Sequence, residues 1–175
     1  MPKLVLLNGP PGVGKSTLAR RYADDHPLTL DLEIDGVRGM ICSWLDEPTR
    51  SGLQARRLAL AMARTHLEEG HDVIVPQLLT RREFVDELQA LAESTGATFH
   101  ELTLLDAKDA VLRRLEGRHE PNGAFSARAL AEKQGSSLEE AYDRFVEALQ
   151  DRPDAVVIRA TAVEDTYASL LHHLT

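Results

Sequence analysis

A glycine-dense turn between two structured segments carries the clearest chemical signal in the sequence. Residues 9–16 read GPPGVGKS, which fits the pattern G-x-x-x-x-G-K-[ST]. Glycines let the backbone wrap closely around an anion, and a helix that begins near the lysine adds its positive end. Such a loop binds the phosphates of a nucleoside triphosphate. The predicted nucleotide contacts are Gly9, Pro10, Pro11, Gly12, Val13, Gly14, Lys15, Ser16 and Thr17.

Two side chains of this loop have separate predicted roles. The ammonium of Lys15 reaches the β- and γ-phosphates as a point charge, and it would stabilise a phosphoryl group during transfer. The hydroxyl of Ser16 is placed to ligate Mg²⁺. ATP and Mg²⁺ are therefore the expected cofactors. The alternative to a nucleotide site is a glycine-rich turn with a purely structural role, in which the lysine binds no phosphate.

A second set of chemically capable residues lies in the segment TLDLEIDGVRGMI, residues 29–41. Asp31, Glu33 and Asp35 alternate with apolar residues, which predicts a strand with three acids on one face. Asp35 lies where this strand would end, and it can take the proton of an attacking hydroxyl. Arg38, one helical turn later, can hold an anionic acceptor or orient Asp35. The alternative is an edge strand with a solvated acidic face.

The elements that must position these residues alternate along the chain. Short apolar segments predict strands at 3–8, 28–34, 72–76, 98–105 and 154–159. Helical patterns separate them, at 14–25, 36–46, 53–69, 80–94, 106–116, 137–150 and 163–174. This alternation predicts an α/β fold with a doubly wound, five-stranded parallel sheet flanked by helices. Ligands of such sheets bind beyond the carboxyl ends of the strands, where Gly9, Asp35 and Gln77 fall.

Length and composition bound the remaining possibilities. The chain has 175 residues, a formal net charge of -8 and one cysteine, which suits a single domain over residues 1–175 in a reducing compartment. The acidic balance and the lack of an aromatic and basic stripe argue against nucleic acid as a partner. With no apolar span and no signal peptide, we expect a cytoplasmic monomer or homodimer without a membrane segment. Cys42 is expected to be a small, buried or half-buried residue of a helix.

On these motifs the sequence resembles the small P-loop kinases of the nucleoside-monophosphate-kinase-like group. Relatives include shikimate kinase, gluconate kinase, chloramphenicol phosphotransferase, the zeta-toxin kinases and bacterial small-kinase proteins called AAA family ATPases. The resemblance covers residues 3–171 and rests on the phosphate loop and on the element formed by Asp35 and Arg38. It implies that Asp35 is the catalytic base or an acceptor ligand. It also implies that Glu33 assists Mg²⁺, although the family pattern has Asp at that position.

The same resemblance implies a small lid over residues 117–135. The stretch RLEGR, residues 114–118, is similar to the lid start of these kinases. There the first arginine packs near the nucleotide base and the second approaches the phosphates, which implies nucleotide contacts for Arg114 and Arg118 and a catalytic role for Arg118. The alternative is an exposed, arginine-rich helix end followed by a plain loop.

The acceptor-binding region is expected over residues 35–55, with further contacts from the segment after the third strand. Related kinases often have an acid where this chain has Gln77, and an arginine that touches the acceptor follows. Gln77 cannot act as a base, but it can donate or accept a hydrogen bond from the acceptor or from a metal-bound water. Arg82 is the corresponding candidate for acceptor contact, with a solvent-facing position in a first helical turn as the alternative.

These observations favour an ATP-dependent phosphotransferase that moves the γ-phosphoryl group of ATP·Mg to a hydroxyl of a small molecule, such as a sugar, antibiotic or nucleoside. A nucleotide kinase or a polynucleotide 5′-hydroxyl kinase is one alternative. A non-catalytic, ATP-binding regulatory module is another, and Gln77 in place of an acid is its main support. The sequence does not identify the acceptor.

Overall fold

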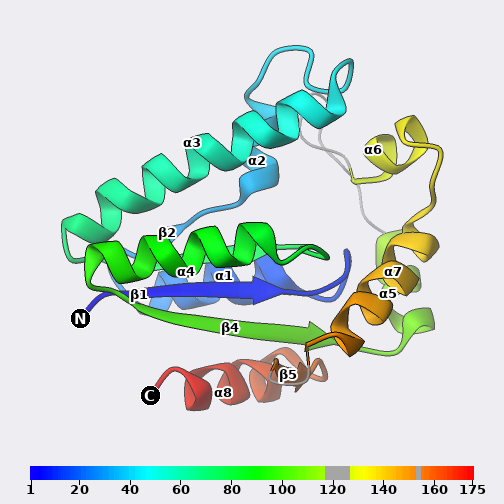
Figure 1. Cartoon of the computed structure of the whole chain (residues 1–175). Helices are drawn as coiled ribbons and strands as arrows, with labels where there is room; N and C mark the ends of the chain where they lie inside the picture. Colours follow the sequence, from blue (N-terminus) through cyan, green and yellow to red (C-terminus); the bar gives the residue numbers. More distant parts are fainter. Residues whose placement is uncertain (117–126, 153–154) are drawn as a thin grey trace.

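Over residues 1–116, 127–152 and 155–175, which the computed structural model describes, the chain forms a five-stranded sheet with helices on both faces (Figure 1). The strands are β1 (Lys3–Asn8), β2 (Leu30–Asp31), β3 (Val73–Gln77), β4 (Thr98–Leu105) and β5 (Val156–Arg159). Their order is β2-β3-β1-β4-β5, and every pair is parallel. The doubly wound parallel α/β fold predicted from the sequence is therefore confirmed.

Helices on the two faces and at one end of the sheet complete the fold. They are α1 (Lys15–Asp25), α2 (Ile34–Gly39), α3 (Pro48–Glu68), α4 (Glu83–Thr95), α5 (Lys108–Glu116), α6 (Ala127–Lys133), α7 (Leu138–Gln150) and α8 (Val163–His173). In Figure 1, α5 and α7 lie near the arrowheads of β1 and β4, α6 lies above them, and both termini lie at the opposite end. Among the described residues, no helix has the length and apolar character needed to cross a membrane.

Alternate residues of the central strand β1 face two apolar layers. Leu4 and Leu6 pack with buried residues of α3 and α4, whereas Val5 and Leu7 pack with buried residues of α1 and α8. All four side chains are fully buried. Burying each such side chain contributes about 1.5–3 kcal/mol, so these layers hold the sheet and fix where the carboxyl ends of its strands lie.

The second strand is shorter than the sequence predicts. A strand over 28–34 was expected to carry three acids on one face, but β2 pairs with β3 only over Leu30–Asp31. Glu33 is the N-cap of α2, and Asp35 lies in the first turn of that helix. The prediction of a shared strand face is therefore wrong.

The burial pattern of α2 explains this difference. Ile34, Val37 and Arg38 are buried at helical spacing, and this spacing prevails over the two-residue alternation that predicts a strand. The helix then ends at Gly39, earlier than expected. Cys42 lies in the turns that follow and is exposed, so the prediction of a buried or half-buried helix residue is also wrong.

The segment expected to form an irregular lid contains a helix. Within the expected range 117–135, the described part begins with α6, whose Ala131 is buried. Residues 117–126 lie outside the described residues. The next helix, α7, begins with a capping box: the Ser137 hydroxyl accepts a hydrogen bond from the Glu140 N–H at 3.1 Å, and the Glu140 carboxylate accepts one from the Ser137 N–H at 2.8 Å.

Candidate active site

The turn between β1 and α1 takes a conformation that glycine permits. Gly12 has a φ of 80°, and a Cβ there would lie 2.6 Å from Cγ of Leu115 and 3.0 Å from the carbonyl oxygen of Val111. Gly14, the N-cap of α1, has a φ of 107°. No side chain caps this helix. A glycine-rich turn leading into an uncapped helix N-terminus is an arrangement that binds phosphate.

Lys15 lies across this turn. Its Nζ donates hydrogen bonds to the carbonyl oxygens of Gly9 at 2.8 Å and of Pro10 at 2.9 Å. Val13 is buried in the apolar layer on the α1 side of the sheet, which anchors the middle of the turn. The positive charge is therefore held within the turn, where a bound phosphate would meet it.

Asp35 and Gln77 meet at the carboxyl end of the sheet. Gln77 ends β3, and its Nε2 donates a hydrogen bond to Oδ1 of Asp35 at 3.3 Å. Burial is the largest influence on Asp35 and raises the pKa of its carboxyl group. The hydrogen bond from Gln77 and the charges of Lys15 and Arg38 lower the pKa and only partly offset burial. The structure thus brings Asp35 and Gln77 into contact and places Lys15 and Arg38 close enough for their charges to act on Asp35.

The other polar atom of the Gln77 side chain has no partner. Oε1 is buried and accepts no hydrogen bond from the residues that the structure describes. Leaving a buried acceptor unsatisfied costs about 1–3 kcal/mol, which a ligand that donates a hydrogen bond would remove. An acceptor hydroxyl and a metal-bound water are both such donors. Oxygen groups such as this one and the Ser16 hydroxyl suit Mg²⁺ and its bound water, because Mg²⁺ prefers oxygen ligands.

Glu33, the other predicted metal residue, is exposed at the start of α2. Its charge is close enough to raise the pKa of Asp35 further. Asp31, at the end of β2, has a buried Oδ1 with no hydrogen-bond partner among the described residues. Burial, and then the charge of Glu33, raise the pKa of Asp31 to about 6. A metal role for Glu33 stays a prediction.

Arg38 points into the protein and is 7% exposed. Its Nε donates to Oγ of Ser51 at 3.1 Å, and its Nη2 donates to the carbonyl oxygen of Pro48. Its guanidinium carbon lies 5.4 Å from the centre of the Trp44 ring. Arg38 therefore ties α2 to the first turn of α3 and braces the expected acceptor region, residues 35–55.

Two of the three remaining predicted arginines pair with carboxylates. Arg82, the N-cap of α4, is exposed and pairs with Asp86 at 3.3 Å. Arg114 on α5 pairs with Asp106. Arg118 lies outside the described residues. Acceptor contact by Arg82 and nucleotide contact by Arg114 and Arg118 stay predictions.

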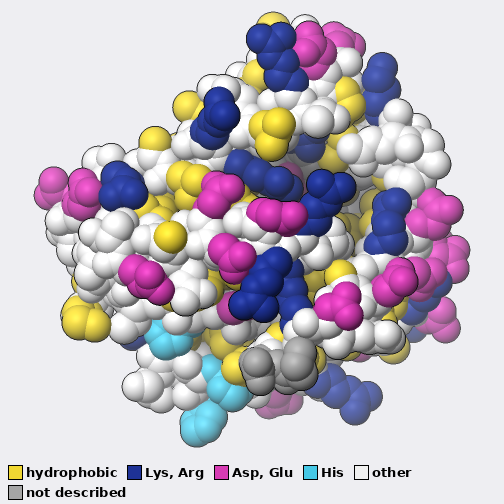
Figure 2. Space-filling model, in the orientation of Figure 1, with side chains coloured by type: hydrophobic (Ala, Val, Ile, Leu, Met, Phe, Trp, Pro, Cys, Tyr) yellow, Lys and Arg dark blue, Asp and Glu magenta, His cyan; other side chains and the backbone are white. Residues whose placement is uncertain are grey.

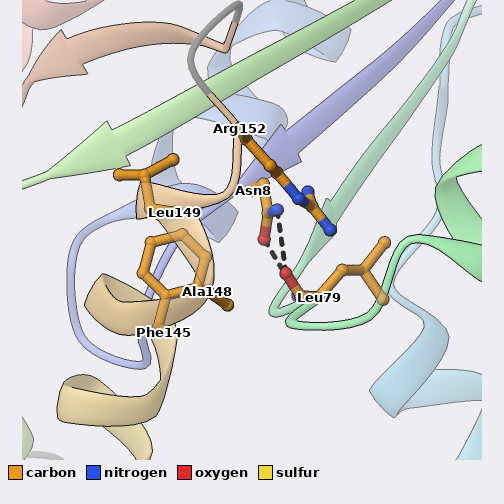
Figure 3. A pocket seen from close by; sticks show the side chains of 6 residues that line it. All are labelled: Asn8, Leu79, Phe145, Ala148, Leu149 and Arg152. Atoms are coloured by element: carbon orange, nitrogen blue, oxygen red, sulfur yellow. Dashed lines mark hydrogen bonds between the residues drawn. The ribbon is translucent and has the colours of Figure 1, made fainter.

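Asn8 is a site residue that the sequence reasoning missed. Its Nδ2 donates to the carbonyl oxygen of Leu79 at 3.1 Å, and its Oδ1 accepts from the N–H groups of Leu79 and Gly9, both at 2.9 Å. Figure 3 shows Asn8 and Leu79 facing each other, beside Arg152 and the apolar side chains of α7. Asn8 thus joins the phosphate loop to the segment after β3. The available signal was a polar residue ending the apolar strand LVLLN.

Comparisons with solved structures find the same fold in several kinases. A sugar kinase from Janibacter sp. HTCC2649 matches over 99% of this chain and 95% of its own, at 19% identity and a TM-score of 0.67. The APS kinase of Mycobacterium tuberculosis, solved with AMPPNP and APS, matches over 99% and 97%, at 18% identity and a TM-score of 0.68. A gluconokinase from Sinorhizobium meliloti 1021 matches over 99% and 95%, at 16% identity and a TM-score of 0.58.

The sequence comparisons add the family. No curated protein matches the chain significantly. A family model described as AAA domain matches residues 4–137, which include the phosphate loop, Asp35 and Gln77. The resemblance to small P-loop kinases is confirmed at the level of the fold, and the chain belongs to this AAA domain family, AAA_33, of P-loop proteins.

Proposed function

We propose that this protein is an ATP-dependent phosphotransferase that moves the γ-phosphoryl group of ATP·Mg to a hydroxyl of a small molecule. The observation that carries the proposal is the carboxylate of Asp35, which accepts a hydrogen bond from Gln77 and is electrostatically coupled to Lys15. A base and a phosphate-binding cation are the two groups that direct transfer to a hydroxyl requires. The fold shared with sugar kinase, gluconokinase and APS kinase supports this reading.

In the proposed reaction Asp35 takes the proton of the acceptor hydroxyl as its oxygen attacks the γ-phosphorus. The new oxygen–phosphorus bond forms while the bond to the β–γ bridging oxygen breaks, and ADP leaves with that electron pair. Lys15 stabilises the negative charge on the phosphoryl oxygens. Arg118 adds positive charge from the lid, and Arg114 contacts the nucleotide.

Mg²⁺, when bound, neutralises charge on the β- and γ-phosphates. The Ser16 hydroxyl would hold it together with phosphate oxygens. The unpaired Oε1 of Gln77 and the carboxylate of Glu33 are the proposed partners for its bound water. On the acceptor side, we assign contacts to Asp35, Gln77 and Arg82, with Arg38 bracing the region.

The test is release of ADP from ATP·Mg by the purified protein, with and without a panel of hydroxyl acceptors. We expect one acceptor class to raise the rate. Asp35→Asn should then lower the transfer rate about a hundredfold to ten-thousandfold, the size of a lost general base. Its affinity for ATP should not fall. Asp31→Asn, which removes the same charge four residues earlier, is the matched control and should retain transfer.

The pH profile adds a second readout. A general base must be ionised, so the rate falls as the pH drops through the pKa of Asp35. Because burial raises that pKa, the acidic limb of kcat/KM should lie at a higher pH than an ordinary aspartate gives. Full transfer by Asp35→Asn would refute the assignment of the base. Tight ATP binding without stimulation by any acceptor would favour the regulatory module, which Gln77 already suggests.

A further inference from the structure

Arg56 is a half-buried cation without a carboxylate partner in the described part of the chain. It lies on α3, and its guanidinium carbon is 5.3 Å from the centre of the Phe84 ring in the first turn of α4. Neither Asp nor Glu of the described residues comes within ion-pair distance of it. By contrast, Arg50 and Arg64 on the same helix pair with nearby glutamates. This contact with the ring restrains the position of the Arg56 guanidinium without using its N–H donors in an ion pair.

A second arginine lies on the same side of α3. Gly52 is four residues before Arg56, which places the two on one helix face. A Cβ on Gly52 would lie 3.6 Å from Cζ of Arg38, so the Arg38 guanidinium covers this face. The two cations are close enough that the charge of Arg56 lowers the pKa of Arg38. The charge of Asp35 raises the pKa of Arg38.

This pair of cations lies on helices that pack on the face of the sheet opposite α1. Phe84 and α3 pack on one face of the sheet, whereas α1, which carries Lys15, packs on the other. Gln77, which donates a hydrogen bond to Asp35, is only seven residues before Phe84, whose ring contacts Arg56. Figure 2 shows Lys and Arg side chains near the middle of the view, interspersed with Asp and Glu side chains. The Arg56 guanidinium has no carboxylate within ion-pair distance among the described residues, so an anion that binds it would supply the missing opposite charge.

We propose that the phosphoryl acceptor is itself an anion, a hydroxyl compound whose carboxylate, phosphate or sulfate group binds Arg56. The planar guanidinium presents paired donors that match these groups. Arg38 donates hydrogen bonds to Pro48 and Ser51, and its positive charge adds to the attraction for the anion. The acceptor hydroxyl then faces Asp35. This inference rests on the proposed phosphotransferase function and names the substrate class of the same site.

The first experiment measures binding of inorganic sulfate and phosphate by calorimetry, with MgAMP-PNP filling the phosphate loop. Three proteins are compared: wild type, Arg56→Gln and Arg57→Gln. Arg57 is the neighbouring residue on α3, exposed, so its variant removes the same charge. We expect Arg56→Gln to weaken ion binding about tenfold or more, as for a lost charged hydrogen bond. Arg57→Gln should stay within about twofold of wild type.

The second experiment compares matched acceptors, for example gluconate with glucose and a sugar phosphate with its free sugar. We expect transfer to the anionic member of a pair, with a KM raised about tenfold or more by Arg56→Gln and with a smaller change in kcat. Which anionic group works best separates carboxylate from phosphate and sulfate. An unchanged MgAMP-PNP affinity and circular dichroism spectrum show that the variant folds.

Two failures can be told apart. If neutral acceptors are preferred and the two variants behave alike in both experiments, the anionic subsite is refuted while the kinase stands. If no acceptor of either kind is phosphorylated, the proposed function fails, and the ion-binding comparison still decides whether Arg56 binds an anion. Equal ion affinity of the two variants would overturn the inference in that case.

Discussion

At the scale of single residues, burial has the largest effect on the pKa values of Asp31 and Asp35. Asp31 and Asp35 both have a raised pKa because their carboxylates lose water on folding. Asp35 receives partial compensation from Gln77 and Lys15, groups that belong to the proposed reaction. For Asp31 the largest compensating influence is the charge of Arg20, which lies outside the site. The fold thus holds both acids at a cost in stability, and only one has a proposed use.

This cost predicts the effect of Asp31→Asn on stability. The pKa of Asp31 rises from 3.8 to about 6 on folding, so the folded state holds this proton more tightly than the unfolded state. Stability is therefore lost as the pH rises through that window. Asp31→Asn should raise the free energy of unfolding at neutral pH by about 1 kcal/mol, after allowance for solvent screening. Below about pH 4 the gain should vanish.

Urea unfolding at neutral pH and at about pH 4 measures this difference. Glu87→Gln is the control, because Glu87 is exposed on α4 and the substitution changes the net charge equally. An equal gain at both pH values would show that the carboxylate charge of Asp31 is not the cause.

At the scale of elements, the phosphate loop depends on how closely α5 packs against it. The space over Gly12 is filled by Leu115 and by the backbone of Val111. A side chain at this position would meet both and would also require a strained backbone, since φ is 80°. The loop is therefore shaped by a helix that follows it by about a hundred residues, in addition to its own glycines.

Substitution at Gly12 should separate these two effects. Gly12→Ala adds the strain of a positive φ and the overpacking against α5, which together cost about 2–5 kcal/mol. Gly70→Ala is the matched control, because Gly70 has a φ of 86° but no atom within 4 Å of an added Cβ. Strain alone should cost it about 1–2 kcal/mol.

Urea unfolding and the Kd for MgATP measure both variants. Gly12→Ala should also bind MgATP more weakly, because the loop must move to relieve the contact. Equal losses of stability in the two variants would mean that contact with α5 does not shape the loop.

At the scale of the whole molecule, the buried side chain of Asn8 links the two halves of the proposed site. Asn8 ends the central strand and is 1% exposed. It holds the first N–H of the phosphate loop and both backbone groups of Leu79, two residues after Gln77. The side-chain amide of Asn8 therefore connects the phosphate loop with the segment after β3. Their relative position is set by this contact as well as by the strand pairing of β1 with β3.

Asn8→Ala should remove this link. It leaves two N–H groups and one carbonyl buried without their partner, which costs about 3 kcal/mol or more in free energy of unfolding. In the folded fraction, kcat for transfer should fall more than the affinity for MgATP, because the base side shifts relative to the loop.

Gln89→Ala is the control for Asn8→Ala, because it removes an amide that is exposed on α4. It should change stability by less than about 0.5 kcal/mol. Comparable losses of kcat and of MgATP affinity in Asn8→Ala would show that Asn8 supports the phosphate loop alone.

The sequence alone determined the features that local patterns encode. The phosphate-loop motif, the alternation of strands and helices and the capping box of Ser137 each depend on residues close together in the chain. From these the parallel α/β fold and the placement of Asp35 and Gln77 at one edge of the sheet could be predicted, because all carboxyl ends of a parallel sheet meet there.

The tertiary structure alone decided where single side chains point. Alternation over residues 28–34 was compatible with a strand, but β2 ends at Asp31, and α2, which buries Val37 and Arg38, begins at Ile34. The sequence predicts that Arg38 holds an anionic acceptor or orients Asp35, but only the structure shows its hydrogen bonds to Pro48 and Ser51. Asn8 and Leu79 are 71 residues apart. No local pattern records such contacts, because burial and hydrogen bonding between distant segments depend on how the whole chain packs.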